Sequence, residues 1–406
     1  MGVPKKPILK LLRLFGSVSD ARVQGRVEYP LREVLMAAFV AVLAGAGTFI
    51  DIWEFCNSKK EWLSDNFMIK HGIPSHDTFR RVLSIIDPSV LQSATVAFLI
   101  DNIRLLRRAF NIEEPELRQY CVDGKTARGT GRLKGTEREV KQLHTLHVYD
   151  RTDGICIFSK QVGDKTNEIP VAQDVLKLLN LQGSVVSFDS LHTQRDTVAT
   201  VVKQKGAYML ALKGNQHALY EEAKSYFTLG RLMQLESSEN NYIEVKSKAH
   251  NRIEIRKYYL TKNISWLVQA KDWAGFKSLI YYSSQTEDIN TGKKTEEDYI
   301  YMSSLTDVVL CADVIRGHWS VENLLHYHLD VNFFEDETMI IDRVAFQNIS
   351  LMNKMALSIT KLIAPLLKKS VRLTKKHIGW NVDTITKSFC FLDEDILEEM
   401  LLNVKV

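Results

Sequence analysis

The order of short apolar segments between residues 119 and 212 constrains the fold of this chain more than any other feature. Helical patterns at 171–181 and 193–204 lie before and after the fourth of these segments, and the turn Arg151-Thr152-Asp153-Gly154 joins the second to the third. A tight turn allows antiparallel strands, whereas the later strands need helical crossovers. The pattern predicts a mixed sheet with helices on both faces. Five segments are short and rich in apolar or β-branched residues, as strands are: 119–123, 143–149, 155–161, 185–189 and 207–212.

This order of three strands, helix, strand, helix and strand is the layout of the RNase H fold, and the other regions have different patterns. We expect an α/β (α+β) protein with a helical N-terminal domain (1–112), the first part of an RNase H-like mixed-sheet core (113–241), a β-rich insertion (242–304), and a region that completes the core and ends in helices (305–406). The insertion is predicted from strand-like segments at 242–245, 252–260, 265–268, 278–283 and 299–303.

An uncharged segment at 34–50 is near the lower length limit for spanning a bilayer. Gly45-Ala46-Gly47 interrupts it, so we predict a buried core helix followed by a turn, and no membrane segment. No signal peptide is expected. The five cysteines form no CxxC pair, which argues against a disulfide framework and a cysteine zinc site and suits a reducing cytoplasm.

The net charge of +4 is unevenly distributed. Residues 1–30 and 124–141 each carry six Lys/Arg against two acids, and 361–382 carry six against none. Such segments are often only solvated faces, but three of them favour a polyanionic partner. The N-terminal helices that end at Arg80-Arg81 either read DNA in the manner of a helix-turn-helix or pack as a cap on the core. Ser75 is expected to cap the last of them.

Two acids follow predicted buried strands: Asp123 ends the first and Asp189 ends the fourth. Alone, each acid can simply end its strand and cap the next turn. In the predicted topology, however, these two strands lie side by side, so the carboxylates meet at one edge of the sheet. Because two carboxylates repel each other in a partly desolvated cleft, such a pair implies a divalent cation.

We expect a third acid, Glu322, from the helix predicted at 307–330. A spacing of about 100° per residue puts leucine and valine side chains, including Leu324, on the opposite face. An alternative is a transition-metal site formed by Glu322, His326 and Asp330, but an oxygen-only site suits phosphate chemistry better. The functional face of this helix is predicted to consist of Arg316, Trp319, Glu322, Asn323, His326 and Asp330.

Three carboxylates can hold two Mg²⁺ (or Mn²⁺) ions per active site. Such a pair activates a water or a 3′-hydroxyl and stabilises the leaving oxygen of a phosphodiester under in-line attack. Since DNA cleavage and the joining of a freed 3′ end are the same displacement with different nucleophiles, one site serves both reactions. No covalent enzyme intermediate is needed.

Motifs along nearly the whole chain resemble those of the ISAs-type, H repeat-associated transposases, insertion-sequence enzymes of the DDE superfamily. GIPSHDTFRRVLSIIDP (72–88) resembles the N-terminal associated domain of that family. The core motifs follow in the family order: CVDGKTARGT (121–130), DKTNEIPVAQDVLKLL (164–179), SFDSLHTQ (187–194), YMLALKGNQ (208–216), HNRIEIRKY (250–258) and RGHWSVENLLHYHLDVNFFEDE (316–337).

The resemblance implies a DDE-type DNA transposase with Asp123, Asp189 and Glu322 as catalytic, metal-binding residues. It further implies double-stranded DNA as partner, both the terminal inverted repeats and the target, and a homodimer in the synaptic complex. Glu168 and His192 are candidates for supporting groups around the acids. The candidate DNA contacts are Lys125, Arg128, Lys213, Asn215, Arg316, His318, Trp319 and His326.

Some of these contacts have simpler alternatives. Lys125 and Arg128 can lie in a solvated turn, and Trp319 can pack under its helix instead of stacking on a base. The superfamily helix that bears the third acid often carries Tyr, Arg, Glu and Lys, where this chain has Ile315, His318, Glu322 and Leu329. Two supporting charges are therefore missing, and Arg316, His326 and Lys213 are candidates to replace them.

Two other functions remain open at this point: an endonuclease without strand transfer, and a DNA-binding relative without catalysis. All three acids are retained, which favours the transposase.

Overall fold

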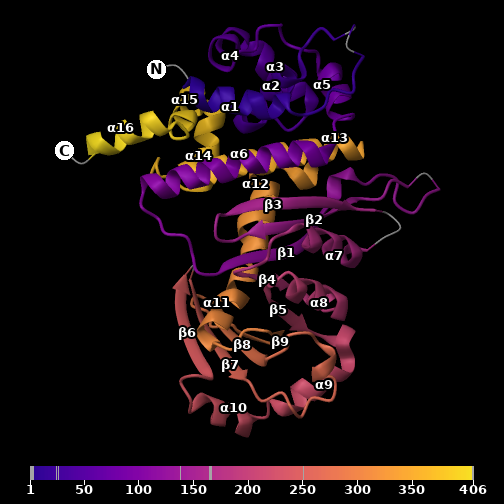
Figure 1. Cartoon of the computed structure of the whole chain (residues 1–406), viewed down its shortest axis with the longest axis vertical. Helices are drawn as coiled ribbons and strands as arrows, with labels where there is room; N and C mark the ends of the chain where they lie inside the picture. Colours follow the sequence, from indigo (N-terminus) through magenta and orange to yellow (C-terminus); the bar gives the residue numbers. More distant parts are fainter. Residues whose placement is uncertain are drawn as a thin grey trace.

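A computed structural model describes residues 4–23, 25, 27–137, 139–163, 167–249 and 251–404. Motif residues 164–166 and His250 lie outside this described part. Along the long axis of the molecule, a helical region is followed by the first strands of a sheet and then by its last strands with their own helices (Figure 1).

Within the described residues, one mixed sheet has the strand order β3-β2-β1-β4-β5-β9-β8-β7-β6. β1 pairs antiparallel with β2 and parallel with β4, and β5 extends the parallel part. The predicted adjacency of the first and fourth strands is therefore confirmed. The strands are β1 (Arg118–Ala127), β2 (Leu143–Asp150), β3 (Ile155–Val162), β4 (Ser184–Phe188), β5 (Ala207–Leu212), β6 (Tyr242–Ala249), β7 (Arg252–Thr261), β8 (Ser278–Asp288) and β9 (Lys294–Ser303).

The β-rich segment 242–304 continues this sheet, because β9 pairs antiparallel with β5. The strand predicted at 265–268 is wrong. This stretch is a turn whose Trp266 ring stacks on Tyr226 at 4.7 Å between centroids and donates its indole N–H to the Asn263 carbonyl. A short apolar run therefore packs here through its aromatic ring rather than through strand pairing.

Helices α7 (Glu168–Leu178) and α8 (Arg195–Lys203) cover one face of the central strands. Alternate strand residues such as Val122 and Val186 point to this side and share a core with Val175 and Val201 of the helices. Asn167 begins α7 by accepting a hydrogen bond from the Ile169 backbone N–H at 3.1 Å. Further along the sheet lie α9 (His217–Tyr226) and α10 (Leu229–Glu236).

The opposite face is covered by one long broken helix and by α13. Residues such as Val185 of β4 pack there against Val314 and Ile315. The broken helix consists of α11 (Val308–His318), a π-helical segment η6 (Val321–His326) and α12 (Tyr327–Phe333); the short turn η7 (Glu335–Glu337) and α13 (Arg343–Ile363) follow.

The two ends of the chain build the helical region together. Buried side chains from residues 8 to 106 and from 321 to 397 belong to one hydrophobic core. Here α13 lies along α6, as Figure 1 shows. The helices are α1 (Lys5–Gly16), α2 (Leu31–Ala44), α3 (Phe49–Ser58), α4 (Lys60–Phe67), α5 (His76–Leu83), α6 (Pro88–Ala109), α14 (Val371–Trp380), α15 (Val382–Cys390) and α16 (Glu394–Val404).

The apolar segment 34–50 forms the predicted core helix. α2 is buried over almost its whole length, and Gly45 ends it with a left-handed φ of 119°, which glycine adopts without a steric penalty. Ser75 caps α5 as predicted, accepting from the Thr78 backbone N–H. By length and composition alone, α6 is long and apolar enough to span a membrane, as are α2 and α3 taken together, although they are bent by 96° relative to each other. Of the most apolar stretch of α6, 56% is buried within the protein.

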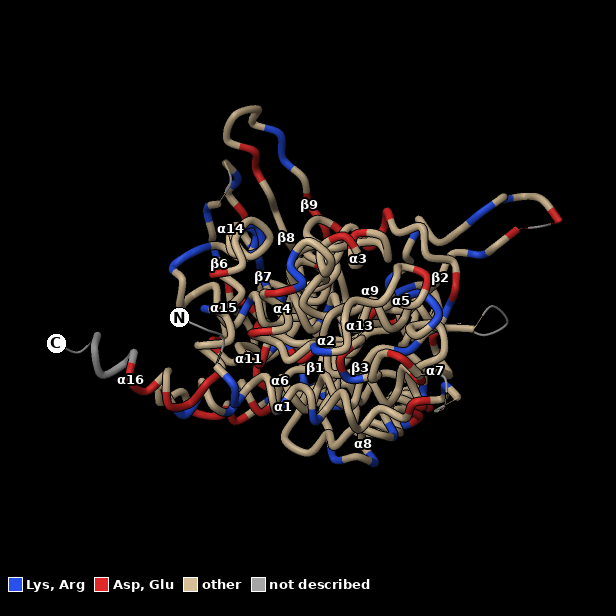
Figure 2. Tube along the Cα trace, turned by 90° about the horizontal axis from the view of Figure 1, so that it is seen from above, with Lys and Arg blue, Asp and Glu red and all other residues tan. Residues whose placement is uncertain are grey.

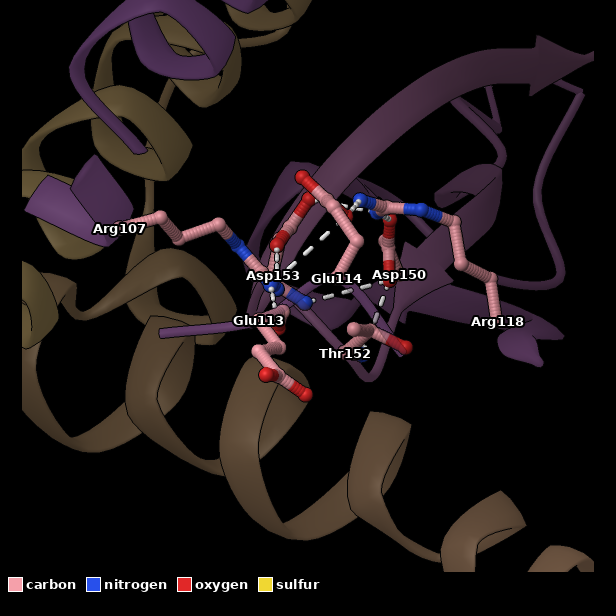
Figure 3. Close-up of polar contacts among 7 residues, drawn as sticks. All are labelled: Arg107, Glu113, Glu114, Arg118, Asp150, Thr152 and Asp153. Carbon is pink, nitrogen blue, oxygen red and sulfur yellow. Dashed lines mark hydrogen bonds and ion pairs between the residues drawn. The ribbon is translucent and has the colours of Figure 1, made fainter. Parts of the chain in front are cut away.

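An ion-pair cluster joins the helical region to the sheet (Figure 3). Arg107, at the end of α6, contacts Asp153 in the β2–β3 turn at 2.6 Å. Arg118, at the start of β1, reaches Asp153 at 2.6 Å and Asp150 at 2.8 Å. Asp150 and Asp153 are almost fully buried, so three chain segments meet through paired charges.

The basic segments differ in what their charges contact. Residues 128–137 and 139–141 of the second basic segment lie in the connection between β1 and β2, which projects from the body near β2 (Figure 2). In segment 361–382, by contrast, Lys375 is buried and donates to the Val42 and Leu43 carbonyls at the end of α2. Lys361 donates to the Gly154 carbonyl at 3.1 Å. Two lysines of segment 361–382 therefore stabilise contacts within the protein.

Candidate active site

Asp123 and Asp189 both come directly after the last residue pair of the β1–β4 ladder, Val122 with Phe188. β1 itself continues to Ala127 through pairing with β2. The Asp123 side chain is 22% exposed. Asp189 is exposed and caps the 3-10 turn η3 (Ser190–His192), accepting from the Leu191 backbone N–H at 3.1 Å.

Glu322 is exposed in the π-helical segment η6. A π-helix bonds residue i to i+5, so its side chains depart from the α-helical spacing used to predict the faces. Leu324, predicted to face the core, is 44% exposed for this reason, while Val321, Leu325 and Leu329 are buried. The prediction for Leu324 is wrong. π-Helical turns occur frequently at functional sites.

The charges of the other two acids act on Asp123. Burial raises the pKa of Asp123 to about 7, and the negative charges of Asp189, Glu322 and Glu168 raise it as well, against a hydrogen bond from the Gly124 backbone that lowers it. A carboxyl in this position keeps its proton near neutral pH unless a cation compensates its charge. Within the described residues, no group of three or more His, Cys, Asp or Glu side chains lies at metal-binding spacing.

Two histidines lie beside Asp123. His326 Nδ1 is 3.6 Å from Asp123 Oδ2, and His326 Nε2 is 2.9 Å from Nδ1 of His147. Burial lowers the pKa of His326 to about 3, and the charges of Lys125 and Lys354 lower it further, so the ring is neutral at pH 7. His326 was predicted to offer a positive charge to DNA phosphates. It is instead neutral and contacts Asp123, a candidate catalytic residue.

His147 was not among the predicted site residues. Only the pairing of the strands points to this residue, because His147 of β2 lies opposite Asp123 of β1. On the other face of β1, Glu168 lies between His144 and His192. His144, on β2, was missed for the same reason as His147.

Lys125, which was predicted to contact DNA, is paired within the protein in this structure. Its side chain is 7% exposed, with Nζ 2.6 Å from Asp330 Oδ1 and 2.9 Å from Asp336 Oδ1. A buried ammonium group needs such partners because burial removes its hydration. Lys125 thus links β1 to α12 and η7. Because Asp330 is paired with Lys125, the alternative transition-metal site of Glu322, His326 and Asp330 is not formed in this structure.

His318 is also placed differently from its predicted DNA contact. Its Nδ1 is 3.1 Å from the Ser187 hydroxyl of β4, and burial lowers its pKa to about 4. It is a neutral packed residue between α11 and the sheet. Trp319, half-buried at the end of α11, remains a prediction.

The other predicted contacts are exposed at the surface. Arg128 is 79% exposed. Lys213 lies over the Tyr299 ring at 5.5 Å, and Arg316 is exposed on α11. Asn215 donates to the Ser190 carbonyl at 2.5 Å, which fixes the turn after Asp189.

Comparison with known proteins gives matches over most of the chain. A family model described as "Transposase DDE domain" matches residues 114–359, and one described as "DDE_Tnp_1-associated" matches residues 12–99. "Putative transposase YncI" of Escherichia coli O157:H7 is 28% identical over 393 residues, covering 95% of this chain and 94% of its own. "H repeat-associated putative transposase YhhI" of Escherichia coli K12 is 28% identical over 82% of this chain and 85% of its own.

Two further matches add less. "Uncharacterized protein in dhlA 3'region" of Xanthobacter autotrophicus is 32% identical over 64% of this chain and 82% of its own. A piggyBac transposase, solved in a synaptic complex with hairpin DNA, aligns with 98% of this chain and 79% of its own at 10% identity, with a TM-score of 0.39. The family match alone covers more than half of the sequence, so the chain belongs to the transposases with a DDE domain and is an insertion-sequence transposase of the DDE superfamily.

Proposed function

We propose that this transposase cleaves DNA at the ends of its element and joins the freed 3′ end to target DNA by a metal-dependent DDE reaction. The observation that carries the proposal is geometric: Asp123 and Asp189 directly follow the same residue pair of the β1–β4 ladder, Val122 with Phe188. The charges of Asp189 and Glu322 both raise the pKa of Asp123, and a bound cation would relieve this repulsion.

Asp123, Asp189 and Glu322 are proposed to hold two Mg²⁺ (or Mn²⁺) ions. The donor set fits these ions, because it is composed of carboxylate oxygens, and Asp123 is paired with a neutral histidine rather than with a Lys or Arg. When bound, such ions supply activation of the attacking oxygen and stabilisation of the leaving oxygen. Since the acids are not at metal-binding spacing in the described residues, their side chains must draw closer.

The chain's own residues would place the acids and the DNA. We propose that neutral His326 supports Asp123 from the side of η6 and that Lys125 holds α12 against β1. Exposed Arg128, Lys213 and Arg316 would bind phosphates, as fixed positive charges do without reading sequence.

The wider architecture belongs to the same proposal. We propose an RNase H-like core in 113–241, completed in 305–406, with DNA-binding helices in 1–112 and the strands of 242–304 between the second and third acids. The partner would be double-stranded DNA with terminal inverted repeats, bound by a homodimer in the synaptic complex in the cytoplasm.

The test uses a plasmid that carries the element ends and a second plasmid as target. We expect the protein with Mg²⁺ to cut at the ends and to produce joined products, while Asp123→Ala binds the ends but does neither. Cleavage without joined products would indicate an endonuclease. End binding without any cleavage, equal in the wild type and Asp123→Ala, would indicate a DNA-binding relative and contradict the proposal.

A further inference from the structure

Glu168, the first residue of α7, bridges two histidines from different segments. Its Oε1 is 2.6 Å from Nε2 of His144 on β2, and its Oε2 is 3.2 Å from Nε2 of His192 at the end of η3. Burial opposes ionisation of this carboxyl, but the hydrogen bonds to His144 and His192 lower its pKa to about 2. Glu168 is therefore ionised at neutral pH.

The bridge packs directly against the backbone that follows Asp123. A Cβ atom on Gly124 would lie 2.6 Å from both Glu168 Oε2 and His144 Nε2, so no side chain fits there. The other ring nitrogen of His144 is 2.7 Å from the hydroxyl of Thr126, which fixes the orientation of that ring. This arm of the bridge is thus anchored to β1 just beyond the first acid.

The second arm is anchored just beyond the second acid. His192 is fully buried and lies in η3, the turn that Asp189 caps. Its ring packs beside Phe188 at 5.5 Å between centroids. One carboxylate therefore connects the segment after Asp123 to the segment after Asp189.

This connection matters because the β1–β4 ladder ends one residue before each acid, at the pair Val122 and Phe188. The ladder therefore fixes the backbone only as far as the two acids, and the separation of the segments beyond them depends on other contacts. The bridge reaches the same two segments from the face of the sheet that is covered by α7. It is placed to set this separation without touching the acids.

We propose that Glu168 is a positioning residue: by bridging His144 and His192 it holds together the segments that follow Asp123 and Asp189, so that the two acids can draw close around a divalent ion. This inference rests on the proposed function of the two acids. Residues that orient metal ligands without binding the ion typically change metal affinity by about 10- to 100-fold when they are replaced.

The experiment compares Glu168→Gln with Asp174→Asn in the full-length protein. Asp174 lies on the same helix, is 60% exposed and pairs with Lys177, so it controls for the loss of one charge from α7. Binding of Mn²⁺ without DNA is measured by electron paramagnetic resonance, and the Mg²⁺ dependence of end cleavage is measured in parallel. Thermal unfolding reports the fold.

We expect Glu168→Gln to weaken Mn²⁺ binding about tenfold and to raise the half-saturating Mg²⁺ concentration similarly, while Asp174→Asn matches the wild type. His192→Asn should give the same shift, and the double variant should add little, since both changes break one bridge. Glu168→Asp keeps the charge but is too short to reach both rings, so it should also weaken Mn²⁺ binding.

A lower melting temperature with unchanged Mn²⁺ affinity in Glu168→Gln would show a merely structural role and overturn the inference. If Glu168→Gln does not fold, His192→Asn and Glu168→Asp decide by the same criterion. A wild type that binds Mn²⁺ and cleaves DNA, beside variants equal to it, overturns the positioning role alone. A wild type that does neither overturns the proposed function as well.

Discussion

The candidate active site and the ion-pair cluster between the helical region and the sheet are both partly buried and rich in carboxylates, but their charge balance differs. In the cluster, Arg107 and Arg118 lie within 3 Å of Asp150 or Asp153, and Glu114 adds a further contact (Figure 3). At the active site, Asp123 has a neutral histidine beside it and two other acids nearby.

The contrast separates two uses of buried charge. The pKa of Arg118 changes in the direction expected for a cation among acids: burial lowers it, but Asp153, Asp150 and Glu114 raise it more, so the guanidinium stays charged. Asp123 instead has its pKa raised to about 7. Buried acids that are paired with arginines hold chain segments together, whereas the carboxylates of the candidate active site lack such partners, and we propose that a cation completes them.

The largest effect is expected from removing an acid of the candidate active site. Asp123→Asn, Asp189→Asn and Glu322→Gln should each reduce Mg²⁺-dependent end cleavage by about a thousandfold or more, because each removes a proposed metal ligand. Single-turnover cleavage of a labelled end measures this. Asp174→Asn serves as the control, and near-normal rates in any of the three variants would exclude that acid from the site.

Breaking the ion-pair cluster should instead lower the stability of the fold. Asp153→Ala leaves two arginines without their shared partner, and we expect unfolding to become easier by about 3–5 kcal/mol. Urea denaturation measures the change. Glu287→Ala, which removes an exposed pair with Lys294, should change stability by less than about 1 kcal/mol. Equal losses in both variants would remove the distinction between these pairs.

The uncompensated carboxylates of the candidate active site should destabilise the metal-free protein. The folded-state pKa of Asp123 lies above its usual value of 3.8, so the folded protein holds this proton more tightly and loses stability as pH rises from about 4 to 7. Asp123→Asn should therefore stabilise the metal-free protein by a few kcal/mol, on the order of the shift, at pH 8. The gain should shrink toward pH 5. A destabilised Asn variant at pH 8 would contradict the raised pKa.

The smallest effect separates two basic residues of one motif. Arg128→Ala should weaken end binding by about 1 kcal/mol and reduce its salt dependence by about one ion, with little change in stability. Lys125→Met should mainly affect stability, because its ammonium is paired inside the protein. Fluorescence anisotropy at several salt concentrations, with melting curves, compares them. A loss of salt dependence in Lys125→Met with unchanged stability would restore the original DNA-contact prediction.

Local patterns were enough to predict the central strands, their helices and the buried α2, and the order of these elements, matched to the RNase H layout, predicted the adjacency of β1 and β4. Asp123, Asp189 and Glu322 were predicted because an acid after an apolar strand, or on a polar helix face, is visible in the sequence. The pairing partners of these elements were not visible. His147 and His144 depend on the β1–β2 register, and Lys125 depends on a contact with α12 about 200 residues away.

The error at Leu324 has a different cause. The helix that carries Glu322 has an α-helical pattern in its sequence. The π-helical segment that displaces Leu324 depends instead on how this helix packs between β1 and α13. Similarly, the strands of 242–304 were predicted as an insertion, but pairing of β9 with β5, which joins them to the central sheet, is a long-range event.

The most direct test of the central claim is thermal unfolding at pH 8 with and without millimolar Mn²⁺. An ion that binds only the folded state raises the melting temperature. We predict a saturable rise for the wild type and for Glu287→Ala, and its loss in Asp123→Asn, Asp189→Asn and Glu322→Gln. A melting temperature that does not respond to Mn²⁺, or that rises equally in all five proteins, would contradict convergence of the three acids on shared divalent ions.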